Sequence, residues 1–157
     1  MRSTQIISAE ARREEIKAHA QSMGIDEAYI SLLVDSFYDK IRVHPALGPV
    51  FNNAIKDNWP AHLAKMKDFW ASIALNAGRY SGKPVPAHKQ HDTIRQAHFS
   101  VWLGLFQQTL DETAPSPAAN RYFMERAERI AQSLQLAIFG APELNAKIAA
   151  GQRAGEP

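Results

Sequence analysis

Apolar side chains recur at three- and four-residue steps along most of this chain, and no stretch alternates regularly between apolar and polar residues. One such run carries Ile30, Leu33, Val34, Phe37 and Ile41. This spacing places side chains on one face of an α-helix, whereas a half-buried strand needs strict alternation. The pattern therefore predicts an all-α fold, and 157 residues are enough for one core but few for two domains.

Capping residues and helix breakers indicate how the chain is divided. Ser8 and Gly24 bracket a polar first helix, so we expect residues 1–25 to form an N-terminal helical extension that adds little to the core. The main domain is then predicted to span residues 26–140. Residues 141–157 are predicted to be a C-terminal tail.

The same signals predict the limits of the helices inside the domain. Helices are expected from Asp26 to His44, from Asn58 to about Asn76, from Thr93 to about Leu110 and from Ser116 to Gly140. Residues 45–58 hold two prolines and a glycine, so they are predicted to be a corner with Phe51 pointing into the core. The Gly- and Pro-rich residues 78–86 are predicted to be a loop, with only a short helical turn around His88.

Composition limits the cofactors and partners of the chain. It has six histidines and no cysteine, which excludes disulfides, cysteine zinc sites, iron–sulfur clusters and thiolate ligation of haem. The 18 Lys and Arg are interleaved with 16 Asp and Glu, so we expect no nucleic-acid partner. The sequence has neither a signal peptide nor an apolar run of membrane-spanning length, so we expect a cytoplasmic protein with no membrane partner.

Two of the predicted helices have apolar faces that are wider than a simple bundle needs. The first carries Trp59, His62, Leu63, Met66, Phe69, Trp70 and Ile73, and the second carries Phe99, Trp102 and Phe106. A flat apolar cofactor fits between such faces, and haem bound by a neutral imidazole suits a chain without cysteine. The other face of the haem needs hydrogen-bond donors, for which Tyr38, His62 and Trp102 are candidates.

Six segments of the chain, taken in order, resemble a known family. They are Phe37-Tyr38, LGPVFNNAI from Leu47, NWPAHLAKMKDFW from Asn58, GRYSGKPVPAH from Gly78, HFSVWLGLF from His98 and ERAERIAQSL from Glu125. Over residues 26–140 this set resembles the group III (P-type) truncated haemoglobins of the globin superfamily. The resemblance implies a shortened globin, with helices crossed two-over-two around haem b.

The resemblance also implies a role for each site residue. His88 would be the proximal iron ligand, with His62 on the opposite, ligand-binding side, where Tyr38 and Trp102 would be the distal hydroxyl and indole donors. The lining of the haem pocket would include Phe37, Phe51, Met66, Phe69 and Phe106. Arg79 and Tyr80 precede His88 and are expected to pair with the haem propionates, although a solvated loop explains them equally well.

The function implied by the resemblance is the binding of dioxygen, nitric oxide and other diatomic ligands. A hydrogen bond to a charged acceptor contributes about 1.5–3 kcal/mol, so two donors would slow oxygen release by about two to four powers of ten. Such slow release suits an oxygen carrier poorly. We therefore favour redox chemistry or detoxification of nitric oxide and oxygen, as a nitric oxide dioxygenase or a peroxidase-like enzyme served by an unidentified reductase, over an oxygen carrier or sensor.

Two other classes of protein are also compatible with the residues. His88 and His91 share a helical face next to Asp92, which suggests a non-haem metal hydrolase. The polar run KQHDTIRQ after His88 departs from the apolar residues expected at a haem edge, and it makes His91 a rival ligand. Alternatively, the aromatic residues are only core, and the chain is a cofactor-free interaction module. An absorption spectrum separates the three, because only a haem protein has an intense Soret band.

Overall fold

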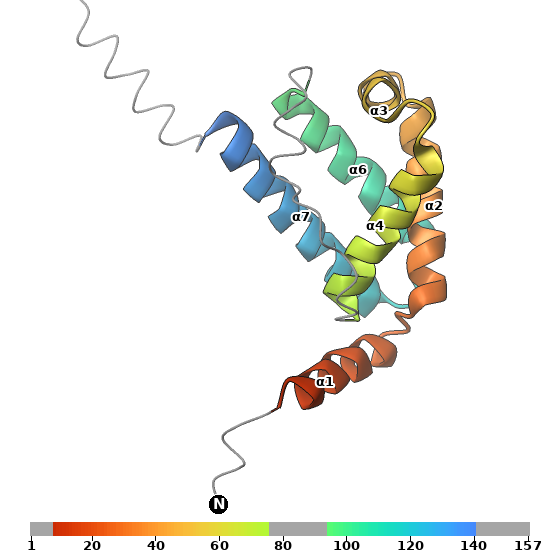
Figure 1. The fold of residues 1–157 in the computed structure, drawn as a ribbon, viewed down its shortest axis with the longest axis vertical. Helices are drawn as coiled ribbons and strands as arrows, with labels where there is room; N and C mark the ends of the chain where they lie inside the picture. The colour runs from red at the N-terminus through yellow and green to blue at the C-terminus, as the bar shows by residue number, and fades with distance from the viewer. Residues whose placement is uncertain (1–7, 76–93, 141–157) are drawn as a thin grey trace, which may run out of the picture.

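The computed structural model describes residues 8–75 and 94–140, which form six helices (Figure 1). They are α1 (Ala9–Ser22), α2 (Glu27–Val43), α3 (Leu47–Ile55), α4 (Trp59–Ala74), α6 (Gln96–Thr113) and α7 (Pro117–Phe139). The prediction of an all-α fold is confirmed, since no strand occurs within these two ranges. None of the described helices has the length and hydropathy needed to cross a membrane.

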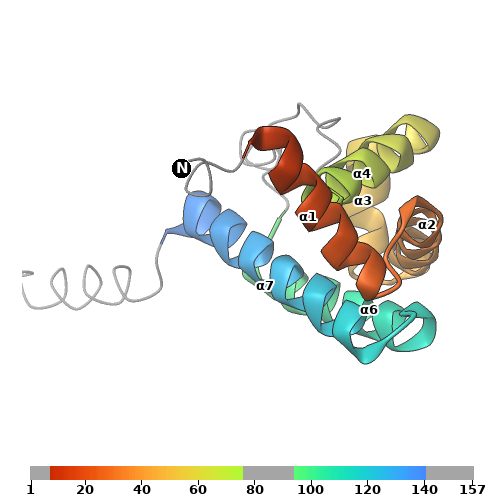
Figure 2. The ribbon, with the colours of Figure 1, turned by 90° about the horizontal axis from the view of Figure 1, so that it is seen from below.

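Helix α1 lies at one end of the molecule, outside the bundle of the longer helices (Figure 1 and Figure 2). Its N-terminus is capped as predicted, because the Ser8 side chain accepts a hydrogen bond from the Ala11 N–H at 3.0 Å. Ala20 is the one buried residue of the helix. Gly24 follows with a φ of 85°, and a Cβ there would lie 2.9 Å from Pro115. This left-handed turn therefore requires glycine.

Helix α2 supplies one wall of the core and contacts α3, α4 and α6. Its buried face consists of the predicted periodic run together with two tyrosines: Tyr29, Ile30, Leu33, Val34, Phe37, Tyr38 and Ile41. The helix starts where predicted, because Asp26 Oδ1 accepts from the Tyr29 N–H at 2.8 Å. It ends at Val43, just before His44 and Pro45.

The prediction of a corner at residues 45–58 was wrong, because most of this segment forms helix α3. Pro49 is tolerated because it lies in the first turn, where a backbone N–H has no partner within the helix. Gly48 is needed for a close approach to α2, since a Cβ there would lie 2.8 Å from the Arg42 carbonyl oxygen. The Phe51 side chain is half-buried and packs against the main core.

Helices α6 and α7 form an antiparallel pair whose turn is fixed by Ser116 (Figure 1). The Ser116 hydroxyl accepts from the Ala119 N–H at 3.1 Å and donates to the Met23 carbonyl at 2.7 Å. It therefore caps α7 and ties this turn to the end of α1. Helix α6 starts and ends about three residues later than predicted, at Gln96 and Thr113, whereas α7 ends before Gly140 as expected.

The centre of the core is a stack of aromatic rings. Phe106 lies between Trp70 and Trp102, with ring centroids 5.3 Å and 5.7 Å apart and planes tilted by 15° and 3°. Phe37 meets Phe106 edge-on at 5.0 Å, and Phe123 meets Trp70 at 5.5 Å. Because these residues come from α2, α4, α6 and α7, the stack fixes the four helices against one another and positions the site beside it.

Candidate functional site

Tyr38 lies at the centre of the predicted distal residues, on the buried face of α2. Only 5% of its surface is exposed. Its ring is surrounded edge-on by four aromatic rings at centroid distances of 5.1–6.0 Å, which belong to Phe37, Phe51, Trp59 and His62. The structure therefore brings residues from α2, α3 and α4 together around a single hydroxyl-bearing side chain.

The Tyr38 hydroxyl makes no hydrogen bond within residues 8–75 and 94–140. Burial raises its pKa well above the ordinary value for tyrosine, and no hydrogen bond opposes the rise. The group thus stays protonated at physiological pH. It is a hydroxyl donor that the described residues leave available for something else.

His62 lies in the first turns of α4, next to Tyr38. Its side chain is half-buried, and the Nε2 atom is fully buried. The imidazole packs against two aromatic rings, with its centroid 5.2 Å from that of Tyr38 and 5.7 Å from that of Trp59. Both pairs are almost perpendicular, at 87° and 89°. This edge-to-face arrangement defines the direction in which the imidazole points.

Sequence reasoning placed Trp59 in an apolar stripe and missed its polar contacts. The indole Nε1–H donates to Asn52 Oδ1 at 3.1 Å, and the Asn52 Nδ2 group donates to the Arg42 carbonyl at 3.2 Å. The Arg42 guanidinium lies 4.7 Å from the centre of the Trp59 ring. The only available signal was an indole N–H in the first turn of a helix, because its partner lay in the segment predicted to be a corner.

Trp102 and Tyr38 both contact Phe37, with ring centroids 5.5 Å and 5.1 Å from that of Phe37. The Trp102 indole is half-buried and stacked on Phe106, and its N–H makes no hydrogen bond to any residue in the described ranges. Phe37 and Phe106 are 1% and 0% exposed, so in this structure they form the support behind the two donors. The other predicted lining residues, Phe51, Met66 and Phe69, are half-buried on α3 and α4.

The predicted residues of the proximal side lie outside the described ranges. They are Arg79, Tyr80 and the iron ligand His88, together with the rival metal ligands His91 and Asp92. Among the described residues, no group of three or more His, Asp or Glu side chains is placed to hold a metal ion. A pocket of about 260 Å³ between α1, α4 and α7 is lined by His19, Tyr122 and Arg126, and it includes none of the predicted site residues.

The chain is similar to known proteins over about seven tenths of its length. It is 36% identical over 114 residues to "Group 3 truncated hemoglobin ctb" of Campylobacter jejuni, covering 71% of this chain and 89% of that protein. Among solved structures, it superimposes on a group III truncated haemoglobin from Campylobacter jejuni with a TM-score of 0.69 and 34% identity, over 73% of this chain and 92% of that one. A group II truncated haemoglobin from Bacillus anthracis, 24% identical over the same shares, has a TM-score of 0.60 and shows the fold alone. No protein-family model matches the chain.

Proposed function

Because the chain belongs to the group 3 truncated haemoglobins, we propose that it binds haem b through His88 and uses it to bind dioxygen and other diatomic ligands such as nitric oxide. Haem supplies an iron atom that holds one protein ligand and leaves one position for a diatomic molecule. The imidazole of His88 holds the cofactor. Arg79 and Tyr80 precede it, and their side chains suit the propionates.

The half-buried apolar residues support the proposal, because they suit a flat apolar group. Phe51, Met66, Phe69 and Trp102 are all partly exposed and packed against the main core. In a simple bundle such large apolar side chains would be buried by another helix or left in water. Haem covers apolar surface of this kind and excludes water from the ligand next to it.

The single observation that carries the proposal is the Tyr38 hydroxyl. The Tyr38 side chain is deeply buried, its hydroxyl is protonated, and no residue in the described ranges accepts its proton. The hydroxyl can therefore donate to an acceptor that the described residues do not supply. A diatomic ligand with partial negative charge is such an acceptor. Trp102 and His62 provide further N–H groups near the same aromatic cluster.

Strong retention of dioxygen favours redox chemistry over transport. Each donor contributes about 1.5–3 kcal/mol to a charged acceptor, which slows oxygen release and leaves time for a second reactant. We infer that this reactant is nitric oxide, and that one nitric oxide, one dioxygen and one electron yield one nitrate. A cytoplasmic reductase supplies the electron for each turnover. Peroxide-type turnover and an oxygen-carrier or sensor role are the other outcomes of the kinetic test below.

An absorption spectrum of the purified protein tests haem binding. We expect an intense Soret band, which a non-haem hydrolase using His88, His91 and Asp92 or a cofactor-free module would lack. Replacement of His88 by Ala should abolish the axial bond, whereas His91→Ala, three residues away, is the matched control and should keep the spectrum. The same spectrum in His88→Ala as in the native protein would show that another residue binds the iron.

Stopped-flow mixing of the oxygenated protein with nitric oxide tests the reaction. We expect one nitrate for each haem in a single turnover, and continued nitrate formation once a reductase is supplied. If nitric oxide merely displaces oxygen and no nitrate appears, the dioxygenase proposal fails and the carrier or sensor role gains support.

A further inference from the structure

We propose that Trp59, held in place by Asn52 and Arg42, is a positioning residue that fixes the His62 imidazole against Tyr38. The inference rests on the proposed function, because it concerns the residues expected to face the diatomic ligand. Trp59 acts through His62, and it adds to the ligand site a part that family resemblance did not assign.

The contacts of His62 show why one neighbour is not enough to fix it. The Tyr38 ring restrains the imidazole from one direction. Trp59 restrains it from a second direction, since its ring meets the imidazole at 5.7 Å and 89°. Trp59 also contacts Tyr38 directly at 5.9 Å. The three rings therefore hold one another, and removal of any one loosens the other two.

The Trp59 indole is itself fixed by three helices. It belongs to α4, its N–H is bonded to Asn52 of α3, and Arg42 of α2 covers its face. The Asn52 amide forms two hydrogen bonds. Its oxygen accepts from the indole N–H, and its nitrogen donates to the Arg42 carbonyl. Reversing this amide would place two donors against each other, so the arrangement has one orientation.

The backbone between α3 and α4 carries strain at the same place. Lys56 has a φ of 57° and a ψ of −120°, the only positive φ of a non-glycine residue in the described ranges. This conformation is sparsely populated for residues with a side chain, and it persists only where the surrounding contacts determine it. The strained residue directs the chain from α3 back into α4, so that Trp59 faces Asn52. The Trp59–Asn52 bond is one of the contacts that hold it.

Trp59 contacts both exposed residues and the residues that are expected to face the ligand. Arg42 and Asn52 are exposed, whereas Trp59 is 6% exposed and its ring contacts both His62 and Tyr38. Loosening the outer residues therefore frees the imidazole without removing any group expected to touch the ligand. The expected result is a mixture of ligand sites, some with the His62 ring near the ligand and some with it turned away.

The carbon monoxide complex tests this inference by infrared spectroscopy, because the C–O stretching band shifts with the polar groups around the ligand. We expect the native protein to give one dominant band. Trp59→Phe keeps an aromatic ring but loses the N–H, and it should produce a second band at the frequency of the His62→Leu variant. Asn52→Ala should do the same, whereas Asn52→Asp retains an acceptor for the indole N–H and should largely restore the native band.

Oxygen release gives a second readout with a double-variant control. Trp59→Phe should change the oxygen off-rate by roughly threefold or more in the native background and leave it unchanged in a His62→Leu background. Tyr29→Phe is the matched control, since it also removes the polar group of a buried ring, while the contacts of Tyr29 are with Thr113 and Phe123 and not with the three rings. It should lower stability and leave the C–O band in place.

Two results would overturn the inference, and they differ from failure of the proposed function. A native protein without a Soret or C–O band would contradict haem binding itself. A native protein with one band that Trp59→Phe and Asn52→Ala leave unchanged would contradict only the positioning role. An equal effect of Trp59→Phe with and without His62 would also contradict it, since Trp59 would then act by another route.

Discussion

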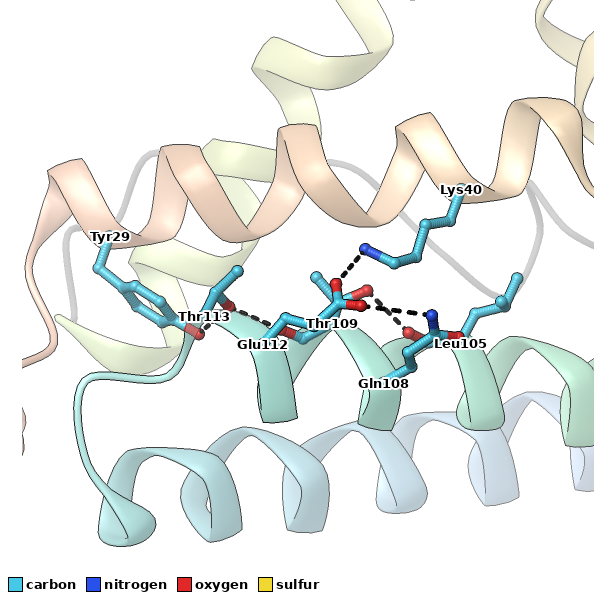
Figure 3. Close-up of polar contacts among 7 residues, drawn as sticks. All are labelled: Tyr29, Lys40, Leu105, Gln108, Thr109, Glu112 and Thr113. Carbon is cyan, nitrogen blue, oxygen red and sulfur yellow. Dashed lines mark hydrogen bonds and ion pairs between the residues drawn. The ribbon is translucent and has the colours of Figure 1, made fainter.

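Tyr29 and Tyr38 are both buried on α2, at opposite edges of its wide apolar face, and their hydroxyl groups have different surroundings. The two side chains are 7% and 5% exposed, so they are almost equally buried. The Tyr29 hydroxyl lies 3.0 Å from Thr113 Oγ1, which in turn donates to the Thr109 carbonyl at 2.7 Å (Figure 3). The Tyr38 hydroxyl has no such partner in residues 8–75 and 94–140.

The difference separates a tyrosine that holds helices together from one that is available to a ligand. Burial raises the pKa of both hydroxyl groups, and of the two only Tyr29 has a hydrogen bond, with Thr113, that opposes the rise. The α2–α6 contact also includes the ion pair of Lys40 with Glu112 at 2.7 Å (Figure 3). The role of a buried tyrosine therefore follows from the hydrogen-bond partner of its hydroxyl and not from the exposed fraction of its side chain.

The largest expected effect is on ligand release after Tyr38→Phe. Loss of a hydrogen bond to a charged acceptor should raise the oxygen off-rate by about 10- to 150-fold. The free energy of unfolding should change little, because the described residues lose no hydrogen bond. Stopped-flow oxygen dissociation and urea unfolding measure the two quantities. An unchanged off-rate would show that this hydroxyl does not face the ligand, and the contrast with Tyr29 would then lose its functional meaning.

The next effect is a loss of stability at alkaline pH. The unfolded tyrosine ionises near its ordinary pKa of 10.0, whereas burial keeps Tyr38 neutral to higher pH in the folded state. The stabilisation that this pKa difference gives to the folded state is fully present below the pKa of the unfolded tyrosine. It is lost as pH rises above that pKa, by up to about 1.4 kcal/mol per pH unit. Urea unfolding between pH 9 and pH 11 should therefore show a steeper decline for the native protein than for Tyr38→Phe. Equal slopes would mean that ionised Tyr38 is solvated in the folded state.

Tyr29→Phe should have the complementary result. It removes the Tyr29–Thr113 hydrogen bond and should lower the free energy of unfolding by about 0.5–1.5 kcal/mol. Thr113 keeps its bond to the Thr109 carbonyl, so no buried hydroxyl is left without a partner. Oxygen release should stay at the native rate. A faster release in this variant would mean that the two tyrosines are coupled through α2, and the separate roles assigned to them would then be wrong.

The smallest effect is expected at Glu112, in the exposed part of the same contact. Its hydrogen bonds to Lys40 first, and then to Gln108, hold the pKa of this carboxyl below its ordinary value. The associated stability is present above the ordinary pKa and is lost as pH falls through the lower folded-state value. Glu112→Gln should therefore shift the melting temperature slightly at pH 7 and not at pH 2, and added salt should shrink the shift. A shift as large as that of Tyr29→Phe would mean that the surface pair, rather than the buried hydroxyl, fastens α2 to α6.

Several parts of the fold were predictable because they depend on residues close together in sequence. Ser8, Asp26 and Ser116 each cap the helix that they were expected to cap. The periodic run of α2, which includes Phe37, identified most of its buried face. The corner at residues 45–58 was mispredicted because prolines and glycines were counted without their position in a helix. Pro49 is harmless in a first turn, and Gly48 serves packing against Arg42.

The candidate site was predictable in its members but only partly in its geometry. The resemblance of the six ordered segments brought Tyr38, His62 and Trp102 into one hypothesis, and the structure brings Tyr38 and His62 into contact and joins Trp102 to Tyr38 through Phe37. The division into residues 1–25, 26–140 and 141–157, and the roles of His88 and its neighbours, stay predictions. Trp59, which the sequence placed only in an apolar stripe, is the residue whose importance was missed.

The sequence by itself determined five of the six described helices, the N-caps of three of them and the family, because each depends on local spacing or on the order of short segments. Only the tertiary structure decided which hydroxyl and N–H groups of the buried aromatic side chains form hydrogen bonds. Tyr29 is bonded to a residue 84 positions away, and Trp59 joins three helices through Asn52 and Arg42. Such pairings depend on how helices cross, and the spacing along α2 does not show what the hydroxyl group of each buried tyrosine meets. The Tyr38 hydroxyl, which forms no hydrogen bond within the described ranges, is the group that we assign to the ligand.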